Sequence, residues 1–209
     1  MKLVLRWPKA LAFVLAAATL VFLPLPSFTP PAHANEVSVI ILVRHADKAS
    51  QPADDPPLTE VGLRRAQDLA DALRTAGVTA IITTQLRRTR ETAQPLATAL
   101  GIVPEVINVG QRALVPNPAV GAQFPPEVIK ERAEYIRTLE LALRRRSGVV
   151  LVVGHDWSVP GLIVSLGGPQ LPNICSSVYD NLFVLTSGKG NANLVHARYG
   201  AATPETDCK

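Results

Sequence analysis

The feature that most constrains the fold is the stretch at residues 37–43, apolar except for Ser38, which ends directly at Arg44 and His45. Val, Ile and Leu follow one another without a polar interruption over residues 39–43, a pattern typical of a strand buried on both faces of a parallel sheet. Open α/β sheets bind ligands beyond the carboxyl ends of their strands. There, an arginine is suited to hold an anion and a neutral imidazole to attack it. A charged strand end that faces water is the alternative interpretation of this pair.

The rest of the chain alternates between strand and helix character, and this predicts an α/β fold. We expect a three-layer α/β/α sandwich around a mainly parallel central sheet. Further strands are expected at residues 78–82, 102–109 and 149–153, with a closing hairpin formed by 182–186 and 193–197. A Pro-rich stretch, residues 110–126, is expected to be a long loop over one edge.

Three helices are expected between these strands. Thr59 is a candidate N-cap for the first, whose expected apolar stripe comprises Leu63, Ala66, Leu69, Ala70 and Leu73. The second covers residues 86–100 and contains Pro95. The third begins at Pro126, and its expected apolar stripe comprises Ile129, Ala133, Ile136, Leu139 and Leu143.

Residues 1–34 have the composition of a cleaved signal peptide. A basic start precedes an apolar stretch at residues 10–23, which is shorter than the roughly 20 residues of a spanning helix. The Ala-x-Ala pattern at residues 32–34 predicts cleavage after Ala34. We therefore expect an exported protein, periplasmic or secreted, with one domain over residues 35–209 and no stable membrane insertion after cleavage. An uncleaved N-terminal anchor is the alternative.

The net charge gives information about binding partners, and the cysteines give information about the cellular compartment. The whole chain carries a net charge of +4, but three of the basic residues lie in the leader, which has no acidic residue. The remaining charge, near +1, gives no indication of nucleic-acid binding. Cys175 and Cys208 are able to pair in an oxidising compartment, and a disulfide between them is slightly favoured. Composition does not indicate the oligomeric state.

Two further segments place a histidine and several arginines at the same predicted edge of the sheet. The apolar run at residues 149–153 is followed by Gly154 and His155, so parallel strands would bring two imidazoles together. The second strand is followed by residues 83–93, Thr-Thr-Gln-Leu-Arg-Arg-Thr-Arg-Glu-Thr-Ala, which supply arginines where helix N-termini gather. Together they predict an anion site with two histidines and at least two arginines.

Four ordered motifs resemble the histidine phosphatase superfamily, in the branch of phosphoglycerate-mutase-like and phosphohistidine-phosphatase-like proteins. They are residues 42–46 (Leu-Val-Arg-His-Ala, in the place of the family's Arg-His-Gly), 57–62, 83–93 and 152–155. The resemblance covers residues 38–186 and implies the family's fold.

The resemblance also implies roles for individual residues. His45 matches the nucleophile that forms a phosphohistidine, Arg44 and Arg88 match the phosphate-binding arginines, and His155 matches the second histidine, which contacts the phosphoryl oxygens. Arg87 or Arg90 could take the place of Arg88. Positioned cations stabilise the charge on a phosphoryl group in transfer, and a covalent intermediate divides the displacement into two easier steps. No cofactor is implied, and no metal is suggested, since no Cys or carboxylate cluster has ligand spacing.

One expected residue is missing. Many members of this branch carry a glutamate between the second arginine and the second histidine, which protonates the leaving oxygen. Residues 108–123 contain no Asp or Glu. Asp156 and Asp47 are the candidate proton donors, and Asp156 resembles the His-Asp pair of the superfamily's other branch. Without a donor, the enzyme would need a substrate with a good leaving group, such as a phosphohistidine or a phosphoanhydride, or it would be slow.

These observations predict an exported histidine-type phosphatase that hydrolyses phosphomonoesters or related small phosphorylated compounds through His45. A non-catalytic module that binds phosphorylated ligands is one alternative, and a phosphoglycerate mutase is a second, less favoured one. The physiological substrate is not predicted, because loop sequence does not give the shape of a binding site.

Overall fold

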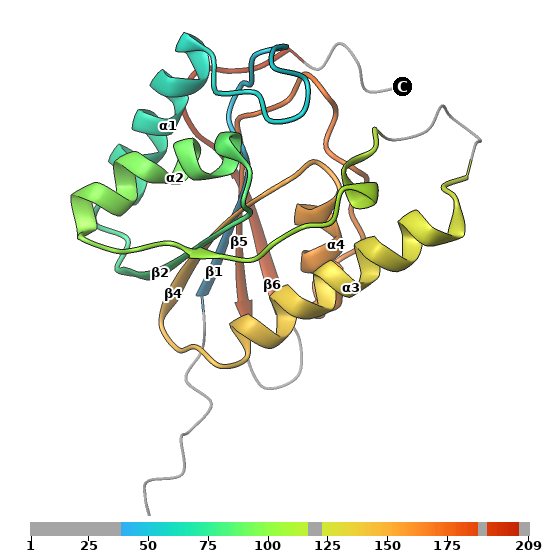
Figure 1. Cartoon of the computed structure of the whole chain (residues 1–209). Helices are drawn as coiled ribbons and strands as arrows, with labels where there is room; N and C mark the ends of the chain where they lie inside the picture. Colours follow the sequence, from blue (N-terminus) through green and yellow to red (C-terminus); the bar gives the residue numbers. More distant parts are fainter. Residues whose placement is uncertain (1–38, 117–122, 188–191, 205–209) are drawn as a thin grey trace, which may run out of the picture. The chain divides into compact units, whose positions relative to one another are not determined.

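A six-stranded sheet organises the described part of the chain, which comprises residues 39–116, 123–187 and 192–204 of a computed structural model. The strand order is β3-β2-β4-β1-β5-β6 (Figure 1). The strands are β1 (Val39–Arg44), β2 (Val78–Thr83), β3 (Glu105–Val106), β4 (Val149–Gly154), β5 (Asn181–Ser187) and β6 (Ala192–Arg198). The first four run parallel to one another, and β5 and β6 are antiparallel to their neighbours. The predicted leader and the hairpin turn at 188–191 lie outside the described residues.

The two central strands, β1 and β4, are buried on both faces, as their unbroken apolar runs predict. Ile40 and Leu42 of β1 belong to one hydrophobic cluster, and Ile41 and Val43 belong to the other. Successive residues of a strand point to opposite faces, so a continuous apolar run is required when both faces are covered. The sheet therefore has a hydrophobic core on each side.

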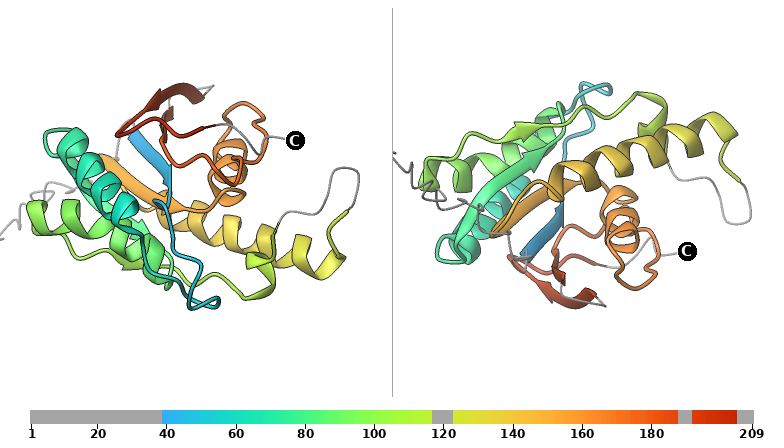
Figure 2. Two further views of the ribbon diagram at one scale, coloured as in Figure 1. Left: turned by 90° about the horizontal axis from the view of Figure 1, so that it is seen from above. Right: turned by 90° about the horizontal axis from the view of Figure 1, so that it is seen from below.

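Helices cover both faces and complete the three layers. They are α1 (Glu60–Leu73), α2 (Arg87–Leu100), α3 (Pro126–Leu143) and α4 (Ser158–Ser165). The cluster that includes Leu69 of α1 and Leu96 of α2 lies on one face of the sheet, and the cluster that includes Leu139 of α3 and Leu162 of α4 lies on the other. Figure 2 shows the two helix pairs on opposite sides of the sheet. The predicted α/β/α sandwich is confirmed.

The predicted apolar stripe of α1 is confirmed at Ala66, Leu69, Ala70 and Leu73, and that of α3 only at Leu139 and Leu143. Thr59 caps α1, because its side chain accepts a hydrogen bond from the backbone N–H of Gly62 (3.1 Å). Leu63, however, is 53% exposed, and α1 instead approaches β1 through Gly62, where a Cβ would lie 2.1 Å from the carbonyl oxygen of Asp47. In α3, Ile129 is exposed and the buried residues are Val128, Tyr135, Leu139, Ala142 and Leu143.

Three further differences from the sequence prediction concern lengths and connections. The strand expected at residues 102–109 is only two residues long. The described part of the loop at 110–126 contains a short 3-10 helix, Arg112–Leu114. Helix α4 was not predicted from the sequence, since its eight residues include both Pro160 and Gly161, which are poor helix formers.

No helix among the described residues is long and apolar enough to cross a membrane. Cys175 is disulfide-bonded. Its expected partner, Cys208, lies outside the described residues.

Candidate active site

The two strand-end histidines lie side by side at the carboxyl edge of the sheet. Arg44 at the end of β1 is in register with Gly154 at the end of β4, and the backbone N–H of His45 donates to the carbonyl oxygen of Gly154 (3.0 Å). The centroids of the His45 and His155 rings are 5.6 Å apart, with an interplanar angle of 65°. Both residues are buried. The structure thus brings together the two imidazoles that the sequence predicts at this edge.

One hydrogen bond determines which nitrogen of His45 is able to react. Nδ1 of His45 lies 2.9 Å from the carbonyl oxygen of Ala46. A carbonyl oxygen only accepts, so Nδ1 carries the proton and Nε2 carries the lone pair. Burial, together with the charge of Arg44 and the neighbouring His155, holds the pKa of His45 well below its ordinary value, although the bond to Ala46 opposes this. At neutral pH, His45 is therefore an uncharged potential nucleophile.

Arg44 is held by backbone oxygens of a distant segment. Its Nη1 donates to the carbonyl oxygens of Cys175 (2.8 Å), Ser176 (3.0 Å) and Val178 (2.9 Å). Its Nε is buried and has no hydrogen-bond partner among the described residues. Nη1 of the guanidinium is thus used in the fold, and Nε is left for an acceptor that the described residues do not supply.

Arg88 is the arginine of residues 83–93 that turns inward. It is buried, whereas Arg87 and Arg90 are exposed, and Arg87 pairs with Glu91 on the helix surface. Burial lowers the pKa of Arg88 from its ordinary value, against the opposing charges of Asp55 and Asp156, but a guanidinium stays protonated in proteins. Its Nε is likewise buried without a partner in the described chain.

A threonine that sequence reasoning missed connects α2 to β1. The hydroxyl of Thr92 donates to the carbonyl oxygen of Arg88 (2.6 Å) and accepts from the backbone N–H of Ala46 (2.9 Å). This side chain joins the backbone of the second arginine to the residue that follows His45. Its two partners are 46 and four residues away in sequence, so only the short link within α2 has a sequence signal.

His155, like His45, is buried and has a strongly lowered pKa. Burial, with smaller effects of the Arg88, Arg44 and Arg132 charges, lowers its pKa to about 3. Its backbone N–H donates to the hydroxyl of Ser158 (2.8 Å), and its Nε2 is buried without a described partner. His155 is therefore neutral across the physiological range.

The two candidate proton donors have different surroundings. Asp47 accepts a hydrogen bond from Nε of Arg65 (2.7 Å), whose side chain is only 3% exposed. This ion pair is part of the packing of α1 against the end of β1. The Asp156 carboxylate accepts from the backbone N–H of Trp157 (3.0 Å), and its charge acts on Arg88 and on Arg132. Asp156, and not Asp47, shares the electrostatic surroundings of the two histidines.

Arg132 of α3 is a further cation that the sequence did not indicate. Its guanidinium lies over the rings of Phe124 (4.1 Å) and Trp157 (4.6 Å) and donates to the carbonyl oxygens of Ala113 (3.1 Å) and Val115 (2.9 Å). The expected stripe of α3 comprised apolar residues alone, so Arg132 was not considered. Its charge contributes to the lowered pKa of His155.

Three buried nitrogens around one neutral histidine define the chemistry of the site. Nε of Arg44, Nε of Arg88 and Nε2 of His155 are without a hydrogen-bond partner among the described residues. A buried donor without an acceptor costs free energy, so such a group of donors and cations fits an anion with several oxygens. A phosphoryl group beside the lone pair of His45 meets this requirement. No group of three or more His, Cys, Asp or Glu side chains suited to a metal ion occurs in the described ranges.

Comparisons with known proteins agree with an α/β phosphoryl-binding site of this kind. Residues 40–109 match the family model of the histidine phosphatase superfamily (branch 1). The probable phosphoglycerate mutase GpmB of Yersinia pestis (strain Pestoides F) is 39% identical over 69 residues, which are 30% of this chain and 32% of the relative. The chain thus matches about a third of the length of this curated relative.

Solved structures share the fold over most of the described chain. The protein histidine phosphatase SixA, complexed with tungstate, superimposes with a TM-score of 0.53 at 18% identity and covers 77% of this chain and 96% of its own. A mycobacterial glucosyl-3-phosphoglycerate phosphatase gives a TM-score of 0.53 at 18% identity, over 80% of this chain and 100% of its own. The histidine phosphatase superfamily, branch 1, is thus the family whose model matches residues 40–109, where three of the four motifs lie, and the solved structures share its fold.

The pH dependence of stability provides a test of the buried, neutral His155. An unfolded histidine titrates near 6.5, and the folded pKa is about 3. Between these values the unfolded chain binds more protons, so stability falls as the pH falls from 6.5 toward 3. From pH 7 to pH 5, the free energy of unfolding measured with urea is expected to drop by on the order of 1–2 kcal/mol more in wild type than in His155→Gln. The exposed His196→Gln is the control, and parallel pH profiles for wild type and His155→Gln would contradict the assignment.

Proposed function

We propose that this protein is a phosphatase that hydrolyses phosphomonoesters or related phosphorylated compounds through a phosphohistidine on His45. The observation that carries the proposal is the set of three unpartnered nitrogens, on Arg44, Arg88 and His155, beside an imidazole whose Nδ1 is protonated. In the first step, the Nε2 lone pair of His45 attacks phosphorus, and the bond from phosphorus to the leaving oxygen breaks. In the second, water attacks phosphorus, the N–P bond breaks, and inorganic phosphate leaves.

The cations act on the charge that this reaction develops. A phosphoryl group in transfer spreads negative charge over its equatorial oxygens. Donors that are already fixed before the reaction stabilise this charge without reorganising, and burial strengthens their effect. Arg44 is fixed by three carbonyl oxygens, and the backbone of Arg88 is fixed through Thr92. A neutral His155 donates a hydrogen bond to the group without adding a charge.

The leaving oxygen needs a proton, and we assign its donor as Asp156. The carboxylate of Asp47 is engaged with the buried Arg65, whereas the charge of Asp156 acts on Arg88 and Arg132 at the site, and this favours Asp156. After donating this proton, Asp156 is the base that takes one from the attacking water, so the enzyme returns to its starting state.

A phosphoglycerate mutase is the second candidate activity, since the curated relative bears that name. The match covers about a third of that relative, and the segment that would hold the mutase glutamate has no acidic residue. The phosphatase is therefore the better-supported activity.

We also infer that the protein is exported after cleavage near Ala34. The basic start, the apolar stretch and the Ala-x-Ala pattern of residues 1–34 support this, and so does the disulfide at Cys175, because disulfides persist in oxidising compartments. Expressed in a Gram-negative host, the protein is expected in the periplasmic fraction with Asn35 as its N-terminus. Edman sequencing of the purified protein checks this, and an N-terminus at Met1 in the cytoplasmic fraction would contradict export.

Loss of His45 is expected to abolish turnover. Replacement of a nucleophile in comparable enzymes lowers kcat by about 10³-fold or more. Wild type mixed with an aryl phosphate should carry acid-labile, base-stable phosphate after rapid quenching, and His45→Ala should carry none. His196→Ala, a histidine on the outer strand, serves as the matched control and should retain labelling. If wild type binds phosphate but neither turns over nor becomes labelled, the non-catalytic module is the correct interpretation.

Asp156→Asn is expected to slow substrates according to their leaving groups. A general acid contributes about 10²–10⁴-fold, and this contribution is needed only where the leaving oxygen is basic. The variant should lose kcat/KM in that range with an alkyl phosphate and far less with p-nitrophenyl phosphate. Asp47→Asn is the control: it should lower the unfolding temperature and show no such dependence. Equal losses on both substrates for Asp156→Asn would exclude it as the donor.

A further inference from the structure

Tyr179 lies against the site. Its ring covers the guanidinium of Arg44, with Cζ 4.2 Å from the ring centroid. The centroid is also 6.0 Å from that of His45. The tyrosine precedes β5, and the segment before it carries the three carbonyl oxygens that bind Arg44.

Tyr179 completes the support of Arg44. The carbonyl oxygens of Cys175, Ser176 and Val178 hold Nη1, which is one corner of the guanidinium. One fixed corner of a planar group still permits rotation about that corner. The face of the Tyr179 ring removes this freedom, because a guanidinium over an aromatic ring is attracted to it and stacks on it. The hydrogen bonds to Nη1 and the stacking on the Tyr179 ring together fix the direction in which Nε of Arg44 points.

The backbone of Tyr179 is itself held by the C-terminal segment. Its N–H donates to the hydroxyl of Thr203 (3.3 Å), and the same hydroxyl donates to Oδ1 of Asp180 (2.6 Å). Asp180 is fully buried and also accepts from Arg198 and from the backbone N–H of Thr203. The ring therefore rests on a hydrogen-bonded support that reaches it from residues 198–203.

We propose that Tyr179 is a positioning residue whose ring orients the Arg44 guanidinium toward the phosphoryl group. It sets how tightly the site binds a phosphate oxyanion, and the ring face, not the hydroxyl, does this. The proposal rests on the proposed function for its relevance to turnover, but phosphate binding by itself is sufficient to test it.

The substitutions Tyr179→Leu and Tyr179→Phe distinguish the effect of the ring on phosphate binding from the effect of the hydroxyl. The probe is inorganic phosphate, measured by calorimetry at a temperature where circular dichroism shows each variant folded. Tyr179→Leu is expected to weaken phosphate binding by about 3- to 30-fold, the range of a desolvated cation–π contact, and to lower kcat/KM for p-nitrophenyl phosphate by a similar factor. Tyr179→Phe, which keeps the ring, should restore both to within about twofold of wild type.

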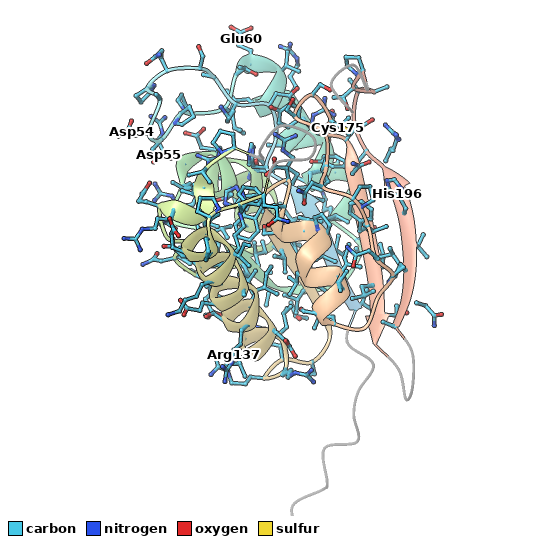
Figure 3. All side chains as sticks on the ribbon, turned by 90° about the vertical axis from the view of Figure 1, so that its right-hand side faces the viewer. Asp54, Asp55, Glu60, Arg137, Cys175 and His196 are labelled. Atoms are coloured by element: carbon cyan, nitrogen blue, oxygen red, sulfur yellow. The ribbon has the colours of Figure 1, made fainter. Side chains whose placement is uncertain are left out.

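Phe183→Leu is the matched control for loss of a nearby aromatic ring. Phe183 is buried in β5 and stacks on His196, with centroids 4.5 Å apart. Figure 3 shows His196 on the outer strand, separate from Cys175 at the upper end of the molecule. This variant should lower the unfolding temperature and retain phosphate affinity. Loss of affinity in Phe183→Leu as large as in Tyr179→Leu would reduce the effect to general destabilisation and overturn the proposal.

Thr203→Val provides a second perturbation if Tyr179→Leu does not fold. It removes the hydroxyl that holds the Tyr179 backbone and leaves the ring in the chain. A smaller loss of phosphate affinity, about two- to fivefold on the scale of one neutral hydrogen bond, is expected. The proposal is overturned by wild-type phosphate affinity in Tyr179→Leu, or in Thr203→Val where the former is unfolded. Equal weakening in Tyr179→Phe and Tyr179→Leu overturns it as well, since the hydroxyl would then be the active part. A wild type that binds phosphate without turnover contradicts the proposed function alone.

Discussion

The parallel pairing of β1 with β4 is the constraint on which the rest of the site depends. Six consecutive residues of each strand are in register, from Val39 opposite Val149 to Arg44 opposite Gly154. Both strands therefore end at the same level, and the residues that follow emerge together. A shift of the register by one residue would send each side chain to the opposite face, bury the wrong set and separate the imidazoles. The burial of apolar residues on both faces of these strands thus fixes the geometry of the polar site, although its own side chains do not belong to the hydrophobic clusters.

The site gathers positive charge in a region from which water is largely removed. Buried charge is costly unless it is paired or hydrogen-bonded. The structure reduces this cost in two ways. The carbonyl oxygens of 175–178 and the face of Tyr179 stabilise Arg44, and burial keeps His45 and His155 neutral. What remains is a set of donors without an acceptor in the described ranges, and a bound phosphate would supply one. Binding of phosphate would then remove the free-energy cost of these buried donors, so phosphate is expected to stabilise the folded state.

Sequence patterns predicted those parts of the site that are determined by residues close together in the chain. Continuous apolar runs gave the central strands, and the strand-end histidines followed from their parallel direction. The apolar stripe of α1 was correct except at Leu63, but that of α3 was correct only at Leu139 and Leu143, because packing against other segments decides which further residues turn inward. The supports of the site, Thr92 and Tyr179, connect segments far apart in sequence and have no periodic signal. The predicted leader and Cys208 lie outside the described residues and stay predictions.

The family's glutamate is absent, and two aspartates are candidates to replace it as proton donor. Their surroundings give them different roles. Each follows a histidine closely, and in sequence both are equivalent candidates. Asp47 is drawn to the buried Arg65, which also donates to the carbonyl oxygen of Ala201 (2.7 Å), so its carboxylate serves to join α1, the end of β1 and the C-terminal segment. Removal of this carboxylate would leave Arg65 buried without a counter-charge, so Asp47 has a structural role. Asp156 has its arginines at the site itself, where a bound phosphoryl group would compete for them. This difference in surroundings, and not the spacing from a histidine, separates the two candidates.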